Sequence, residues 1–98
     1  MCIRDRKNTA FVINTARGDI IDEKALVQAL INKEIAGAGL DVFETEPNIP
    51  NELKTMENVV SFPHLGSATI ETRLAMGNTA IDNTLAFFAG TDLPNKVV

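Results

Sequence analysis

The first two thirds of the chain contain three short apolar runs, which are separated by polar segments. The first spans residues 9–15 and contains Phe11, Val12 and Ile13, an unbroken apolar pattern typical of a strand buried on both faces of a parallel sheet. The others lie at residues 38–43 and 58–62, the last stopped by Pro63. The pattern therefore predicts three short strands.

An amphipathic segment lies between the first two runs. Asp22 is placed to accept hydrogen bonds from the first turn of a helix, and Glu23 adds negative charge where the helix dipole favours it. Leu26 and Leu30 then share one face. With Lys33 near its end, this spacing predicts a helix over about residues 22–33.

A longer amphipathic segment fills the last third of the chain. Thr69 is the expected N-cap, Gly90 suits the C-terminal end, and Pro94 follows the stop. About 20 residues at ~1.5 Å each give a helix of roughly 30 Å, which needs a partner surface. Its apolar face consists of Ile70, Leu74, Gly77, Ile81, Leu85 and Phe88.

The order of these elements is strand, helix, strand, loop, strand and long helix. The loop at residues 44–51 contains Pro47 and Pro50. This alternation predicts an α/β fold with a parallel sheet and crossover connections. Residues 1–6 fit no element well, and we expect them to be a leader or tail outside the fold.

Composition narrows the class of protein. The 98 residues are 45% apolar and 22% charged, which is typical of a small globular domain or part of a larger one. One cysteine, Cys2, excludes an internal disulfide framework and a cysteine-rich zinc site. The net charge of −4 argues against a nucleic-acid binder. No apolar run is long enough to span a bilayer and no secretory signal is evident, so we expect a cytoplasmic protein without membrane or metal.

Polar residues directly follow each predicted strand. Ligands of open α/β sheets bind at the carboxyl ends of the strands, where residues 15–18, 41–46 and 63–67 should meet. Together they supply one guanidinium, several carboxylates and the only imidazole. An arginine can hold a carboxylate with two hydrogen bonds, a histidine can exchange a proton near neutral pH, and a glutamate can orient it. This set suits a small 2-oxo or 2-hydroxy acid.

Each candidate also has a structural interpretation. A lone histidine such as His64 is more often a structural hydrogen-bonding group, Arg17 could lie on the surface, and Glu46 could be a solvated loop carboxylate. Asp41 interrupts an apolar strand, where a buried carboxylate requires partners, so functional and structural roles are equally open. Residues 66–67 could be cap residues or could offer N–H groups to an anion.

Three segments resemble a known family. Residues 13–30, 37–47 and 57–76 are closely similar to the D-isomer-specific 2-hydroxyacid dehydrogenases, within them to the glyoxylate/hydroxypyruvate reductase and D-glycerate dehydrogenase branch. The resemblance runs from about residue 7 to residue 98. Three motifs in the right order, each following a predicted strand, are far more specific than any one of them.

The resemblance implies a role for each candidate. It implies that Arg17 binds the substrate, that His64 donates the proton with Glu46 as its partner, and that Asp41 binds the nicotinamide carboxamide. The implied reaction is hydride transfer between NAD(P)H and a small 2-oxo acid such as glyoxylate or hydroxypyruvate. The residues implied to line the nicotinamide end of the cofactor are Thr15, Ala16, Arg17, Asp41, His64, Gly66 and Ser67.

The resemblance also implies a division of the chain. Residues 1–6 would be a leader, residues 7–67 the C-terminal part of a Rossmann-type NAD-binding domain, and residues 68–98 a long interdomain helix with its tail. No G-x-G-x-x-G turn occurs in the sequence, so it does not distinguish NAD from NADP. Full-length members are expected to be homodimers, and the 98-residue chain by itself to be inactive.

Two other functions stay open at this point. One is an NAD(H)-sensing protein similar to the transcriptional corepressors related to this family, which keep the fold and similar site residues. The other is an inactive remnant. Turnover of glyoxylate or hydroxypyruvate would distinguish an enzyme from both.

Overall fold

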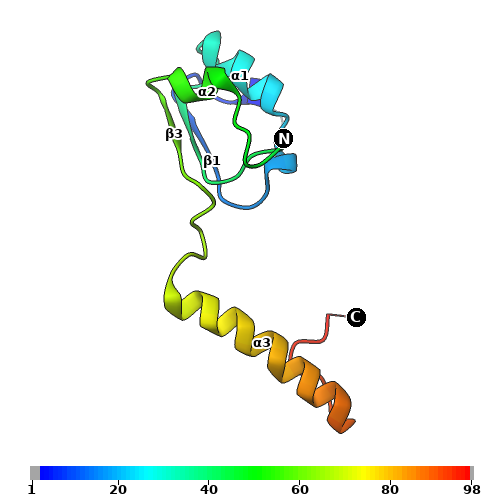
Figure 1. Cartoon of the computed structure of the whole chain (residues 1–98). Helices are drawn as coiled ribbons and strands as arrows, with labels where there is room; N and C mark the ends of the chain where they lie inside the picture. Colours follow the sequence, from blue (N-terminus) through cyan, green and yellow to red (C-terminus); the bar gives the residue numbers. More distant parts are fainter. Residues whose placement is uncertain (1–2, 98) are drawn as a thin grey trace. The chain divides into compact units, whose positions relative to one another are not determined.

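A computed structural model describes residues 3–97, which divide into two units that meet between Gly66 and Ser67 (Figure 1). The first unit holds a small parallel sheet with helices, and the second a long helix with its tail. The elements are η1 (Ile3–Asp5), β1 (Phe11–Asn14), η2 (Gly18–Ile20), α1 (Glu23–Ile31), β2 (Gly37–Leu40), α2 (Asn51–Thr55), β3 (Val59–Ser61) and α3 (Ile70–Ala89).

The three strands form one parallel sheet in the order β1-β2-β3. Val12 pairs with Ala38, which in turn pairs with Val59 on the far strand. This confirms the predicted α/β class and the three strands, although each strand is shorter than its apolar run. In β2 the apolar run continues to Phe43, whereas the strand ends at Leu40.

The hydrophobic core lies on the face of the sheet that α1 covers. Val12, Ala38 and Leu40 point to this face, and Leu26 and Leu30 of α1 are 1% and 3% exposed. Packing of this kind stabilises the unit because each buried aliphatic side chain contributes about 1.5–3 kcal/mol. The remaining core residues are Ile3, Ile21, Val27, Ala29, Ile35, Phe43 and Leu53.

The other face of the sheet is open. Phe11 and Ile13 are 66% and 67% exposed, and Val60 on β3 is 56% exposed. The prediction of a first strand buried on both faces is therefore wrong in this structure: β1 alternates between exposed and buried positions. The reason is that the helices described in this unit pack on one face only, so every second strand residue lacks a covering layer.

The two long helices begin where their capping residues predict. The Asp22 carboxylate accepts a hydrogen bond from the Ala25 N–H at 3.0 Å, and α1 ends two residues before the predicted end at position 33. Thr69 caps α3 in the same way, accepting from the Thr72 N–H at 3.2 Å. Gly90 ends α3 in the left-handed conformation, with φ of 66°.

The structure contains two short elements, η1 and α2, that the sequence pattern does not predict. Residues 1–6 were predicted to fit no element, yet Ile3–Asp5 form a 3-10 turn and Ile3 is 5% exposed in the core. That part of the prediction is wrong, because the buried side chain of Ile3 is enough to anchor a turn against α1. Met1 and Cys2 lie outside the described residues. Likewise, α2 is held by one buried side chain, Leu53, at 1% exposure.

The second unit consists of α3 and the tail that follows it. No residue of α3 is buried within the structure, and its apolar face is open, with Leu74 and Leu85 both more than 60% exposed. The tail folds back on the helix through Asn83 and Asn95, whose side chains pair at 2.9 Å. No helix among residues 3–97 has the length and apolarity needed to cross a membrane.

Candidate functional site

The centre of the candidate site is a hydrogen-bonded pair of Glu46 and His64. The Nδ1 atom of His64 lies 2.9 Å from Oε2 of Glu46. The second carboxylate oxygen, Oε1, accepts the backbone N–H of Phe43 at 2.9 Å. Glu46 is thus fixed at both oxygens. Because the pair engages Nδ1, Nε2 is the ring nitrogen of His64 that remains for a reacting group.

The electrostatics of Glu46 follow from these contacts. The hydrogen bond from His64 lowers the pKa of the Glu46 carboxyl, and the Phe43 N–H lowers it further, against a smaller opposing effect of burial. The positive charge of Arg17 lowers the same pKa. Glu46 is therefore ionised at neutral pH.

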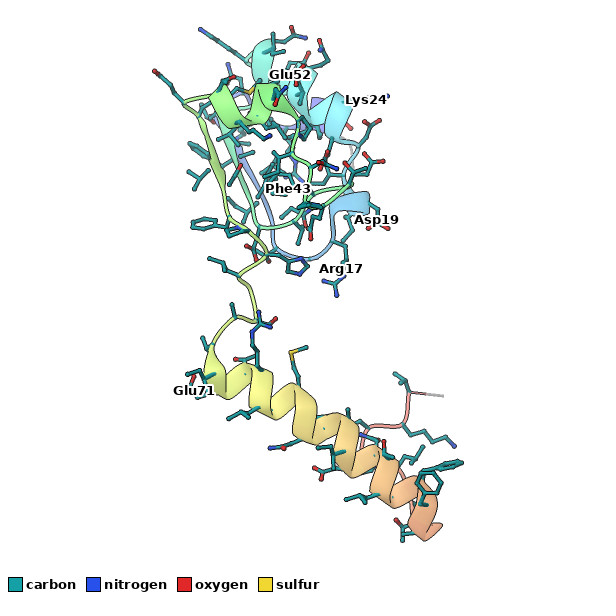
Figure 2. All side chains as sticks on the ribbon, viewed as in Figure 1. Arg17, Asp19, Lys24, Phe43, Glu52 and Glu71 are labelled. Atoms are coloured by element: carbon teal, nitrogen blue, oxygen red, sulfur yellow. The ribbon has the colours of Figure 1, made fainter. Side chains whose placement is uncertain are left out.

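Arg17 extends from the loop that follows β1 (Figure 2). The buried side chain of Asn14, the last residue of β1, shapes this loop: its Nδ2 donates to the Arg17 carbonyl at 2.8 Å and its Oδ1 accepts from the Ala16 N–H at 3.1 Å. The guanidinium itself is exposed and donates to the Ala16 carbonyl at 2.6 Å. The backbone of Arg17 is thus held while its charged group faces solvent.

Asp41 lies directly after β2 and is 7% exposed. Its Oδ1 accepts the backbone N–H of Leu65 and its Oδ2 accepts that of Gly66, both at 2.7 Å. Such short bonds to a carboxylate are charge-assisted and strong. Both oxygens of the buried carboxylate therefore have hydrogen-bond partners, although Asp41 lies just after the strand and not inside it as predicted, and these bonds connect the segment after His64 to the end of β2.

Tight backbone contacts bring the loops together. A Cβ atom at Gly18 would overlap the backbone carbonyl of Phe43, so only glycine allows η2 to approach this loop so closely. The carboxylate of Glu23 on α1, 7% exposed, accepts the Glu44 N–H at 2.6 Å. Both contacts anchor the loop that carries Glu46 on its N-terminal side, at Phe43 and Glu44.

The first unit thus brings most of the predicted residues to the carboxyl edge of its sheet. Glu46 and His64 are hydrogen-bonded, Arg17 lies in the loop after the neighbouring strand β1, and Asp41 accepts the backbone N–H of Gly66. Thr15 and Ala16 lie in the same loop as Arg17. Ser67 begins the second unit, so its predicted contribution stays a prediction. In residues 3–97 no three His, Cys, Asp or Glu side chains gather as metal ligands.

Sequence reasoning missed two side chains that build this edge, Asn14 and Glu23. Asn14 had the same signal as Asp41, a polar residue at the end of an apolar strand. Glu23 was interpreted only as an acidic residue of the first helical turn. The structure shows that it is buried and bonded to a loop 21 positions away.

Comparison with known proteins places the chain in a family. Residues 2–66 match the family model described as the D-isomer specific 2-hydroxyacid dehydrogenase, NAD binding domain. The chain is 56% identical over 92 residues to glyoxylate/hydroxypyruvate reductase B of Enterobacter sp., covering 93% of the chain and 28% of that protein. It is 48% identical over 88 residues to 2-ketogluconate reductase of Gluconobacter oxydans, covering 90% and 28%.

Solved structures of reductases are also similar to this chain. The NADPH-dependent glyoxylate/hydroxypyruvate reductase of Sinorhizobium meliloti, in complex with NADP and malonate, superposes with a TM-score of 0.89 at 46% identity, over 94% of the chain and 29% of that protein. A glyoxylate reductase from Paecilomyes thermophila gives a TM-score of 0.92 at 36% identity, over 97% and 29%. The chain spans less than a third of the length of these relatives. It belongs to the NAD-binding domain family of the D-isomer-specific 2-hydroxyacid dehydrogenases.

Proposed function

We propose that this chain is the catalytic C-terminal part of an NAD(P)-dependent oxidoreductase that interconverts a small 2-oxo acid, such as glyoxylate or hydroxypyruvate, and its 2-hydroxy acid. The observation that carries this proposal is the Glu46–His64 pair at 2.9 Å, with Arg17 in the loop at the same end of the parallel sheet. These groups match what reduction of a keto acid requires: a carboxylate-binding cation and a proton donor.

Arg17 binds the substrate in this proposal. Its guanidinium is exposed at the end of a loop that Asn14 fixes, so it is free to take a carboxylate by two parallel hydrogen bonds. Its positive charge also polarises the adjacent carbonyl, because negative charge develops on that oxygen as the carbonyl is reduced.

His64 gives the proton to the forming alkoxide. Its Nδ1–H donates to Glu46, so the proton that leaves is the one on Nε2. Ionised Glu46 stabilises the positive charge that the ring carries before transfer, and the Phe43 N–H keeps the carboxylate in place. In the reverse direction the same nitrogen accepts the proton of the hydroxy acid.

The nicotinamide cofactor, NAD or NADP, supplies the hydride when it is bound. The residues fit its nicotinamide end, because each oxygen of Asp41 accepts one backbone N–H and keeps a further lone pair for a carboxamide N–H. Gly66 lies against this carboxylate: a Cβ there would be 3.1 Å from Oδ2. We propose that Asp41 and Gly66, together with Thr15, Ala16 and Ser67, line this end.

The relatives support an enzyme over a corepressor-like sensor, since those compared above are named reductases. Two finer points belong to the same proposal. A homodimer of the full-length protein rests on the family resemblance, whereas the open apolar face of α3 indicates only that this helix packs against another surface. A cytoplasmic location is the second point, and the single cysteine of this sequence fits a reducing compartment.

A segment exchange tests the proposed function. Residues 7–98 replace the matching segment of the Enterobacter sp. reductase, and oxidation of NADPH or NADH is followed with glyoxylate and hydroxypyruvate. We expect turnover in the chimera and its loss in the His64→Gln chimera. A folded chimera that binds the cofactor but turns over neither acid would contradict the proposal.

A further inference from the structure

His64 has an uncommon backbone conformation. Its φ is 56°, in the left-handed region, where residues other than glycine are few. It lies beyond β3 in a segment without regular secondary structure, and its neighbours Pro63 and Leu65 are exposed. Packing is therefore not what holds this residue in place, and the conformation needs another source of stability.

The two backbone bonds to Asp41 supply that stability. The N–H of Leu65 belongs to the peptide unit that starts at the Cα of His64, so fixing its direction fixes ψ of His64. The N–H of Gly66 fixes the next peptide unit. One carboxylate accepts both at 2.7 Å, and it is buried at the end of β2, whose own position the sheet determines.

We propose that Asp41 is a positioning residue, whose carboxylate holds the His64 backbone in the left-handed conformation that directs Nδ1 onto Glu46. The effect of Asp41 on catalysis rests on the proposed function, whereas its effect on the His64–Glu46 contact does not. This role is separate from the predicted contact with the cofactor, because it uses the carboxylate without any ligand.

The substitution Asp41→Asn tests the role with almost no change in volume. Asparagine keeps one oxygen acceptor but turns an NH2 group toward the second backbone N–H, so one bond is lost and two donors face each other. Asp22→Asn is the matched control, because it makes the same change of charge at the N-cap of α1, where asparagine caps as well as aspartate.

The measurement is the titration of the Glu46 carboxyl carbon by NMR in the full 98-residue chain. His64→Gln gives the midpoint of Glu46 without its partner. We expect Asp41→Asn to move the midpoint upward by more than half of the interval between the parent chain and His64→Gln, and Asp22→Asn to leave it unchanged. An Asp41→Asn chain that keeps the amide spectrum of the sheet and the parent midpoint overturns the proposal.

Amide hydrogen exchange in the parent chain keeps the proposal testable if Asp41→Asn does not fold. We expect the Leu65 and Gly66 amides to exchange at least about tenfold more slowly than their sequence predicts. Exchange at the intrinsic rate overturns the proposal. An inactive chimera with slow exchange at these amides would contradict the proposed function and leave the role of Asp41 intact.

Discussion

His64 and Glu46 are 18 positions apart in the sequence and 2.9 Å apart in the structure. Glu46 lies in the loop after β2, and His64 follows β3. Because β2 and β3 are parallel neighbours, their carboxyl ends reach the same edge of the sheet, and the segments beyond them meet there. The contact between Glu46 and His64 therefore depends on the order of the strands in the sheet.

Replacing His64 by Gln should raise the pKa of Glu46 toward its ordinary value of 4.5, because the hydrogen bond from His64 is the largest cause of its lowering. A carboxyl with a lowered folded-state pKa stabilises the fold above its unfolded pKa and loses this contribution as the pH falls through the folded value. The difference in unfolding midpoint between parent and variant should thus shrink below about pH 4.5. Urea unfolding at several pH values measures it; a pH-independent difference would contradict the assignment.

Gly18→Ala should destabilise the first unit by roughly 1–3 kcal/mol or more, because the new Cβ overlaps the Phe43 carbonyl and the two loops must separate. Gly77→Ala is the matched control: a Cβ there meets no heavy atom within 4 Å, and alanine in the interior of α3 should favour the helix by about 0.5–1 kcal/mol. Thermal unfolding of both variants checks the opposite signs. Equal effects would contradict the close approach at Gly18.

Leu26→Ala should cost about 2–5 kcal/mol, because this side chain is 1% exposed in the core. Ile13→Ala should cost less than about 1 kcal/mol in the same chain, since Ile13 is 67% exposed on the open face. Denaturant unfolding compares the two. A loss at Ile13 as large as at Leu26 would mean that the open face is covered in solution.

The 98-residue chain should bind NADH weakly or not at all. It has no glycine-rich pyrophosphate turn, and its sheet is covered on one face only, so the chain should also be marginally stable. Titration calorimetry with NADH measures the affinity. A dissociation constant in the micromolar range would contradict this prediction.

In the active chimera, His64→Gln should lower kcat by about 10²–10⁴, the usual contribution of a general acid. Arg17→Lys keeps the charge but loses the bidentate geometry, so it should act mainly by raising KM for the keto acid. Steady-state kinetics with glyoxylate separates the two. An Arg17→Lys chimera with unchanged KM would argue that this guanidinium does not hold the substrate.

Local chemistry made part of this protein predictable. The caps at Asp22, Thr69 and Gly90 depend on residues within one helical turn, so the helices begin and end close to where the sequence predicts. The apolar runs predicted three strands, but not their ends, because strand bounds depend on pairing with neighbours. The sequence pattern also does not predict α2, because this short helix depends on packing of its buried residue, Leu53, in the core.

The sequence by itself determined which chemical groups are present and that they follow successive strands. Only the tertiary structure decided what each group contacts. Asp41 could have been a ligand-binding or a structural carboxylate, and its partners, the N–H groups of Leu65 and Gly66, lie 24 and 25 positions away. Helix caps need only neighbours in the chain, whereas contacts across the sheet edge exist only after the parallel strands have paired in their final order.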